Sequence, residues 1–137
     1  VPVIAHPERN LVFQGRPDLL AELIGHGARV QLTASSLTGA FGPQARAAAE
    51  TFLRRRLVHF VATDAHNTTR RAPLMREAVR VLRDVAGDEA AAALTRSNPQ
   101  AVIENRGLPW EPEPLPAPPA GFFTRLRSFL AREKPYN

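Results

Sequence analysis

Cysteine is absent from the 137-residue sequence, and this absence excludes several functions at once. The chain cannot form disulfide bonds, bind zinc through thiolates or use a cysteine nucleophile. No apolar run approaches the roughly 20 residues that a membrane-spanning helix requires. The P-loop, GxGxxG, GxSxG and HExxH motifs are also missing. What remains is the composition of an ordinary globular protein, with 44% hydrophobic and 23% charged residues.

Lysine is almost absent, because Lys134 is the only lysine among the 18 basic residues. The formal net charge is +5 and the sequence pI is about 11.2, values that are compatible with nucleic-acid binding. However, the arginines are scattered among acidic residues along the expected helices. Their largest cluster, at residues 54–56, falls at an expected helix end, where it complements the helix dipole. We therefore expect no nucleic-acid partner.

The first residues, VPVIAH, lack both the basic stretch and the cleavage pattern of a secretory signal peptide. They also lack an initiator methionine, which indicates a fragment or an unusual start. We therefore expect a cytoplasmic protein.

Proline divides the sequence, because six of its 13 prolines lie within residues 109–119, in PWEPEPLPAPP. Such a stretch is typical of a semi-rigid polyproline spacer. We therefore expect a globular part over residues 1–108, a Pro-rich linker over 109–119 and a tail over 120–137. The tail predicts an amphipathic helix that docks on protein or on an anionic membrane, because its apolar residues recur at helical spacing: Phe122, Leu126, Phe129 and Leu130.

The globular part alternates strand and helix patterns. Strands are expected at residues 3–5, 29–33 and 57–63, a loop at 34–42, and helices at 17–25, 43–55, 73–86, 88–96 and 99–105, with Asp88 and Asn98 as N-caps. This alternation favours an α/β fold with a parallel sheet. Because a complete (β/α) barrel needs about 250 residues, the pattern predicts either a small open sheet or part of a barrel.

Polar residues follow two of the expected strands, at the end where α/β proteins bind ligands. His6 follows the first strand, and Asp64 and His66 follow the third. Asp64 and His66 are two residues apart, so in extended chain they face the same way. A carboxylate and imidazoles suit Mn, Zn or Fe, and the sequence therefore predicts a metal site from these three residues. A capped helix with an exposed histidine is the alternative reading, whereas His26 and His59 are interpreted as structural.

Two arginines lie just beyond these residues, Arg9 after His6 and Arg71 after His66. A guanidinium binds phosphate through two hydrogen bonds and keeps its charge at any working pH. We therefore consider Arg9 and Arg71 as phosphate-binding residues, against the alternative of ordinary surface arginines. Arg70 competes with Arg71 for this assignment.

Four segments, VIAHPERN, VQLTASSLTGAFG, LVHFVATDAHN and SNPQAVIEN, resemble the C-terminal part of the bacterial manganese-dependent protein tyrosine phosphatases of the PHP superfamily. These enzymes act on the tyrosine kinases of capsule and exopolysaccharide biosynthesis. The resemblance covers about residues 2–105, and HPER followed by DAHN is a specific combination. The Pro-rich stretch and the tail lie outside it.

The resemblance implies a PHP-type (β/α)₇ barrel around two or three metal ions, with Mn²⁺ as cofactor. This chain corresponds to the last three βα units and the terminal helices. His6, Asp64 and His66 match metal ligands, and Arg9 and Arg71 match arginines near the phosphotyrosine. The family's early His-x-His strand has no counterpart here, so we expect about half of the metal site to be missing.

We therefore hypothesise a metal-dependent phosphotyrosine protein phosphatase that acts on a bacterial tyrosine kinase at the inner face of the membrane. Because thiol chemistry is excluded, hydrolysis would use metal-activated water. Two alternatives stay open: another PHP phosphoesterase, for instance one acting on histidinol phosphate, and an inactive truncated remnant or interaction module. Open sheet edges also predict that residues 1–108 alone aggregate or oligomerise.

Overall fold

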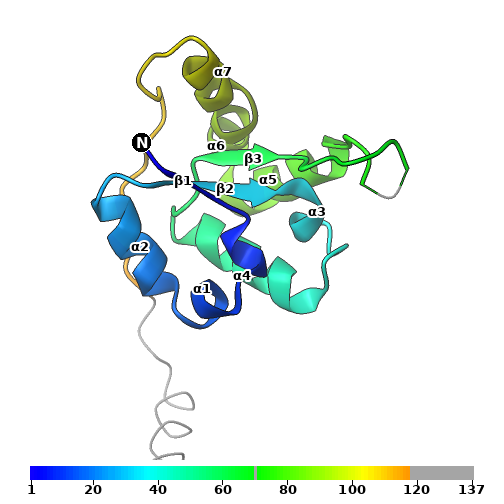
Figure 1. The fold of residues 1–137 in the computed structure, drawn as a ribbon, viewed down its shortest axis with the longest axis horizontal. Helices are drawn as coiled ribbons and strands as arrows, with labels where there is room; N and C mark the ends of the chain where they lie inside the picture. Colours follow the sequence, from blue (N-terminus) through cyan, green and yellow to red (C-terminus); the bar gives the residue numbers. More distant parts are fainter. Residues whose placement is uncertain (70, 118–137) are drawn as a thin grey trace, which may run out of the picture.

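The computed structural model describes residues 1–69 and 71–117. Its centre is a parallel three-stranded sheet in the order of the sequence: β1 (Val3–Ala5), β2 (Arg29–Thr33) and β3 (Phe60–Ala62) (Figure 1). Ile4 pairs with Val30, and Leu32 pairs with Val61. All three strands therefore end at the same edge, and the expected α/β class with a parallel sheet is confirmed.

Helices follow each strand. They are η1 (Pro7–Arg9), α1 (Leu11–Gly15), α2 (Pro17–Gly25), α3 (Ala34–Leu37), α4 (Pro43–Arg54), α5 (Arg76–Ala86), α6 (Asp88–Ala92), the π-helical turn η2 (Ala93–Ser97) and α7 (Asn98–Ile103). Proline opens α2 and α4, where its missing N–H costs nothing and its fixed φ suits the first helical turn. Within the described residues, no helix is long and apolar enough to cross a membrane.

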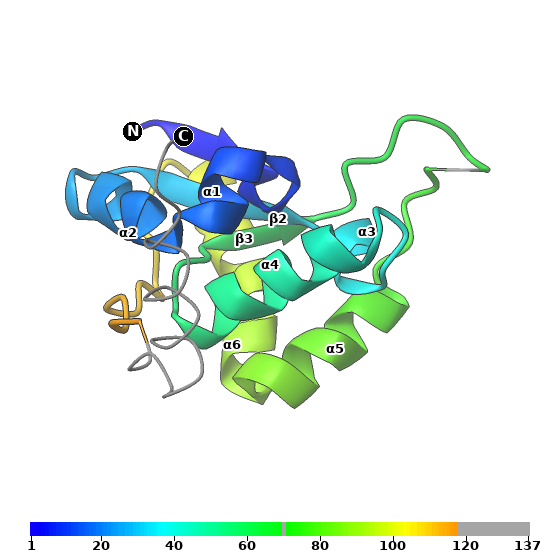
Figure 2. The same ribbon diagram turned by 90° about the horizontal axis from the view of Figure 1, so that it is seen from below.

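The core lies on one face of the sheet, between the strands and the helices that Figure 2 shows beneath them. Alternate strand residues point into it, as the period of two requires. Its fully or almost fully buried members include Leu20, Val30, Leu32, Leu37, Phe52, Leu57, Val61, Leu82 and Leu94.

The opposite face of the sheet is more open. Val3 on β1 is 51% exposed, and Val102 and Ile103 on α7 are 55% and 80% exposed. Together with Phe60 they line a hollow of about 270 Å³. One face of the sheet is thus covered and the other only in part.

Several elements differ from the expectation. Helix α5 begins at Arg76 instead of residue 73, and the helix expected at 88–96 divides into α6 and η2. Residues 34–42, expected as a loop, begin with the short helix α3, because the Thr33 N–H and the Ser36 hydroxyl both bond to the buried Glu8 carboxylate. Helix α1 was not expected, and the Asn10 side chain caps its first turn. The strand expected at 57–63 shortens to β3, because its neighbour β2 pairs only with Phe60–Ala62.

Asn98 was expected to be an N-cap and has a different role. Ser97 precedes α7 without a side-chain cap, and the buried Asn98 amide instead donates to the carbonyls of His59 at 3.0 Å and Trp110 at 2.7 Å. Its Oδ1 accepts from Trp110 N–H at 3.2 Å. Asn98 therefore joins the start of the Pro-rich stretch to the sheet.

Other contacts continue this attachment. Arg55 was expected to complement the dipole of α4, but its side chain is buried and reaches Asp18 and the Leu115 carbonyl. Leu115 N–H in turn donates to the Arg55 carbonyl at 2.9 Å. Glu111 pairs with Arg29 at the start of β2. The part of the Pro-rich stretch that the structure describes, up to residue 117, thus lies against the domain, while the predicted tail helix at 120–137 lies outside the described residues.

Candidate functional site

The carboxylate of Asp64 is the centre of an ion-pair cluster at the carboxyl end of the sheet. Its Oδ2 accepts from Arg9 Nη1 at 3.2 Å and from Arg71 Nη2 at 2.5 Å. Arg9 ends η1, just after β1, whereas Arg71 lies at the end of the loop that follows β3. The structure therefore brings Arg9, Asp64 and Arg71 together from two different strands. Arg70, the competitor of Arg71, lies outside the described residues.

The three side chains of this cluster stay accessible. Arg9, Asp64 and Arg71 keep 32%, 21% and 31% of their side-chain surface exposed. Ion pairs at such exposure contribute little to stability, typically about 0–1 kcal/mol each. The cluster can therefore exchange Asp64 for another anion at small cost, as a phosphate-binding site must.

The backbone bends sharply at two of the strand ends. His6 and Asp64 have φ angles of 41° and 51°, in the left-handed region that non-glycine residues rarely adopt. At His6 the N–H still bonds to the Gln31 carbonyl of β2 at 2.9 Å, so the turn follows directly on the last ladder bond. Strained backbone of this kind is more frequent at functional sites, and this agrees with the selection of His6 and Asp64 as candidate site residues.

The His66 ring is oriented by the backbone of Asp64. Its Nδ1 lies 2.7 Å from the Asp64 carbonyl oxygen, and a carbonyl can only accept. In the neutral ring, Nδ1 therefore carries the hydrogen and Nε2 carries the lone pair. Histidines that bind metal through Nε2 commonly donate their Nδ1 hydrogen to a carbonyl or carboxylate in this way. The side chain is 54% exposed, which leaves that nitrogen approachable.

The structure does not assemble the three predicted ligands into a complete metal site. Across residues 1–69 and 71–117, no group of three or more His, Asp or Glu side chains is placed to hold a metal ion. Asp64 and His66 share one loop, and the Asp64 carboxylate is bound by arginines instead. The donor types fit a divalent transition metal, but the set among the described residues is incomplete.

Two residues of this end were not predicted from the sequence. Glu8, which lies between His6 and Arg9 in the sequence, is completely buried. Its Oε1 accepts from Thr33 N–H at 3.1 Å and from the Ser36 hydroxyl at 2.6 Å. These bonds tie η1 to the end of β2 and the start of α3. The only available signal was its position inside the HPER motif.

Phe41 is the second such residue. The Cζ atom of Arg9 lies 4.3 Å from the centre of the Phe41 ring, and that of Arg71 lies 5.8 Å from it. Phe41 follows β2 and α3, so the ends of all three strands contribute to this cluster. A single aromatic residue in the sequence GAFG carries no chemical signal, and for this reason Phe41 was missed.

His59 has the structural role that the sequence indicated. It is 2% exposed, and its Nδ1 accepts from the Val30 N–H at 3.2 Å. Burial, with a smaller contribution from Arg29, lowers the pKa of His59 to about 4. The ring is therefore neutral at physiological pH and joins the early parts of β2 and β3.

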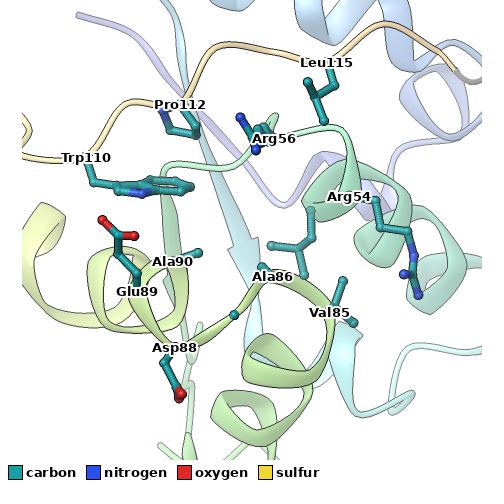
Figure 3. A pocket seen from close by; sticks show the side chains of 12 residues that line it. Arg54, Arg56, Val85, Ala86, Asp88, Glu89, Ala90, Trp110, Pro112 and Leu115 are labelled. Carbon is teal, nitrogen blue, oxygen red and sulfur yellow. The ribbon is translucent and has the colours of Figure 1, made fainter.

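A cavity of about 600 Å³ lies elsewhere, between the ends of α4 and α5, the start of α6 and the Pro-rich stretch. Trp110, Pro112 and Leu115 line it from that stretch, with Trp110 next to Glu89 and Ala90 (Figure 3). None of the five predicted site residues lines it. The chemistry predicted for the strand ends therefore has no connection with this cavity.

Comparison with known proteins gives consistent matches. A family model described as "Capsular polysaccharide synthesis, CpsB/CapC" matches residues 1–104, which include all five predicted site residues. Tyrosine-protein phosphatase YwqE of Bacillus subtilis (strain 168) is 41% identical over 108 residues, covering 79% of this chain and 42% of YwqE. Tyrosine-protein phosphatase CpsB of Streptococcus pneumoniae is 34% identical over 107 residues, covering 74% of this chain and 44% of CpsB.

The fold matches as well. A solved structure described as "Crystal structures of YwqE from Bacillus subtilis and CpsB from Streptococcus pneumoniae, unique metal-dependent tyrosine phosphatases" superposes with a TM-score of 0.79 at 38% identity. The match covers 86% of this chain and 47% of the solved chain. The chain thus spans less than half the length of the relatives that it matches.

Proposed function

Because the chain belongs to the capsular polysaccharide synthesis CpsB/CapC family, we propose that it carries part of the active site of a metal-dependent phosphotyrosine protein phosphatase. One observation supports this most directly. Two arginines from separate strand ends converge on Asp64, next to the oriented His66, inside the region that the family match covers. Relatives over this region include the tyrosine-protein phosphatases YwqE and CpsB.

Arg9 and Arg71 are the residues that bind the phosphoryl group in this proposal. Both guanidiniums already hold a carboxylate oxygen, and a phosphoryl oxygen is an equivalent acceptor with more charge. They offset the negative charge on the equatorial oxygens in the transition state. Because both are about one-third exposed, they can move from Asp64 to the substrate.

His6, Asp64 and His66 are the metal-binding residues of this chain. The carbonyl of Asp64 keeps the lone pair of His66 on Nε2, and the Asp64 carboxylate lies on the same loop. A bound divalent ion, Mn²⁺ in our proposal, supplies a water of lowered pKa and neutralises phosphoryl charge. In this proposal the remaining donors come from outside the matched region, which covers 42% of YwqE.

The same proposal extends to the fold. We interpret the three-stranded sheet as part of a PHP-type (β/α)₇ barrel, in which helices cover the outer face of the strands. The open inner face, with exposed Val3, and the partly covered hollow near Phe60 support this interpretation. Residues 109–119 then link the barrel part to the tail, and unpaired strand edges favour association of the isolated chain.

The proposal also covers the substrate and the location of the enzyme. We propose that the phosphotyrosine lies on a tyrosine kinase of capsular or exopolysaccharide biosynthesis, and that the enzyme acts in the cytoplasm at the inner membrane face. Residues 120–137 are the expected peripheral contact with membrane or protein. Sedimentation of a peptide of residues 120–137 with anionic vesicles at low salt tests the membrane contact. A peptide that stays in solution would contradict this contact.

The activity is best tested in a chimera. Residues 1–104 of this chain replace the matching part of B. subtilis YwqE, and hydrolysis of a phosphotyrosine peptide is measured with and without Mn²⁺. We expect Mn²⁺-dependent turnover, with Asp64→Ala in the same chimera as the inactive control. The 137-residue chain alone should bind Mn²⁺ weakly and show little turnover, because an incomplete donor set cannot hold a metal cluster.

The same experiment separates the two alternatives. A folded chimera without turnover on any phosphate ester favours the remnant or interaction module. A clear preference for histidinol phosphate over the phosphotyrosine peptide favours another PHP phosphoesterase. Turnover by the isolated chain at the rate of full-length YwqE would contradict the expectation that its metal site is incomplete.

A further inference from the structure

We propose that Phe41 is a positioning residue, whose ring holds Arg9 and Arg71 side by side so that both address one phosphoryl group. This inference rests on the proposed phosphatase function and adds to it a residue outside the predicted ligand and arginine set. Phe41 makes no contact with the reacting atoms in this proposal. It acts through the two guanidiniums.

The contacts that carry the proposal are both cation–π contacts. Arg9 Cζ lies 4.3 Å and Arg71 Cζ lies 5.8 Å from the ring centre, within the distance of roughly 6 Å at which a ring attracts a guanidinium. Arg9 comes from the end of β1 and Arg71 from the loop after β3. These two segments lie more than 60 residues apart in the chain, and Phe41 contacts the key side chain of each.

The turn that presents Phe41 is well defined. Gly39 and Gly42 have φ angles of 88° and 90°, which L side chains rarely adopt, and Gly42 N–H donates to the Gly39 carbonyl at 3.0 Å. Ala40 N–H donates to the Ser35 carbonyl of α3 at 2.9 Å. Phe41 therefore sits at the centre of a glycine-bounded turn anchored on α3, and its backbone is fixed relative to the sheet.

The chemistry explains why a neutral partner is useful here. Asp64 now pairs with both arginines and offsets one of their two positive charges, and a metal on its carboxylate would compete with both pairs. Two guanidiniums released from it would repel each other and separate in solvent. An aromatic face attracts both cations without competing for the oxygens of a phosphate. Phe41 can therefore keep the pair together through the change of partner.

Two substitutions separate the ring from its bulk. Phe41→Leu keeps an apolar side chain and removes the aromatic face, whereas Phe41→Tyr keeps the face. In NMR spectra of the 137-residue chain, the side-chain signals of Arg9 and Arg71 should show ring-current shifts in the wild type and in Phe41→Tyr, and lose them in Phe41→Leu. Circular dichroism and Trp110 emission verify that each variant is folded.

Binding of inorganic phosphate to the same chain, followed by ³¹P NMR titration, measures the consequence. We expect Phe41→Leu to bind phosphate roughly three- to fivefold more weakly, and Phe41→Tyr to bind it within about twofold of the wild type. In the YwqE chimera, Phe41→Leu should raise KM for the phosphotyrosine peptide more than it lowers kcat, whereas a loss of folded protein would lower kcat alone.

The outcomes distinguish the role of Phe41 from the proposed phosphatase function. Wild-type phosphate affinity in Phe41→Leu, or unchanged arginine shifts, overturns the role of Phe41 and leaves the proposed function intact. A wild-type chain that binds no phosphate overturns the assignment of Arg9 and Arg71, and with it the proposed function. Weaker phosphate binding in Phe41→Leu with rescue in Phe41→Tyr supports both.

Discussion

The two ends of the sheet treat their polar groups in opposite ways. At the carboxyl end, Arg9, Asp64 and Arg71 form charged pairs that remain between 21% and 32% exposed. At the amino end, the Asn98 side chain is fully buried, and it bonds to the backbone of His59 and Trp110. The Arg9–Asp64–Arg71 cluster is charged and accessible, whereas the Asn98 cluster is neutral and centred on a buried side chain.

This contrast separates function from stability. Exposed charges are weak stabilising contacts but can be transferred to a ligand. A buried amide with satisfied bonds is costly to disturb, since its loss leaves partner groups without these hydrogen bonds. We therefore expect substitutions at the carboxyl end to change activity, and substitutions at the amino end to change the free energy of unfolding.

The largest expected effect is on activity at the carboxyl end. Asp64→Ala or His66→Ala in the chimera should lower turnover by at least about 100-fold. Loss of a residue that only hydrogen-bonds to a metal ligand already lowers metal affinity or activity by about 10–100-fold. The free energy of unfolding of Asp64→Ala should fall by no more than about 2 kcal/mol, because two ion pairs of about 0–1 kcal/mol each are lost. Kinetics and urea unfolding measure the two quantities.

Asp88→Ala is the matched control for Asp64→Ala. Asp88 is an exposed acid that pairs with Arg83, away from the strand ends, and its loss should leave turnover unchanged. If Asp64→Ala kept about a tenth of the rate, we would withdraw its assignment as a ligand.

The next effect concerns pH and the amino end. The pKa of His59 is about 4 in the folded protein and ordinarily 6.5, so between these values only the unfolded chain binds the proton. The free energy of unfolding should therefore fall as the pH falls from about 6.5 to 4, by about 3 kcal/mol in total. Urea unfolding across this range measures it.

Two variants test the origin of this pH dependence. His59→Gln removes the titrating group and should flatten the dependence between pH 6.5 and 4. His26→Gln, at an exposed position, should retain it. A flat profile in the wild type would show that His59 does not remain neutral on folding.

A somewhat smaller effect is expected at Asn98. Asn98→Ala removes three hydrogen bonds and leaves polar groups of His59 and Trp110 without these partners, at a cost of roughly 2–3 kcal/mol. Trp110 emission should also shift to longer wavelength as the Pro-rich stretch loosens. Gln100→Ala, on the exposed side of the same helix, is the control. Equal thermal stability of the two variants would break the contrast between the sheet ends.

The smallest effect is expected at an exposed pair on α4. Arg46 and Glu50 are spaced i, i+4 with their nitrogen and oxygen 3.1 Å apart. Arg46→Ala should lower the free energy of unfolding by at most about 0.5 kcal/mol, and this difference should vanish at high salt. A cost above about 1 kcal/mol in urea unfolding would mean that surface pairs matter more here than this contrast assumes.

The sequence predicted much of the local structure because the signals are local. The strand Arg29–Thr33 and the helix beginning at Pro17 were located to the residue, since alternation, proline and the glycines after the helix all lie within one segment. The unusual polar residues after β1 and β3 predicted a site at this edge, and the structure places Arg9, Asp64 and Arg71 in contact there. Their roles as ligands stay predictions.

The contacts that build the site join distant segments, and only the tertiary structure decided them. Phe41 meets Arg9 and Arg71 because three parallel strands end at one edge, and Glu8 is buried because η1 folds onto the start of α3. Asparagine is a preferred N-cap residue, but the buried hydrogen bonds of Asn98 to the His59 and Trp110 carbonyls outweigh that local preference. Hydrophobic periodicity and helix capping depend on residues that are close in the sequence. Burial and side-chain pairing depend on which distant segments come into contact in the fold.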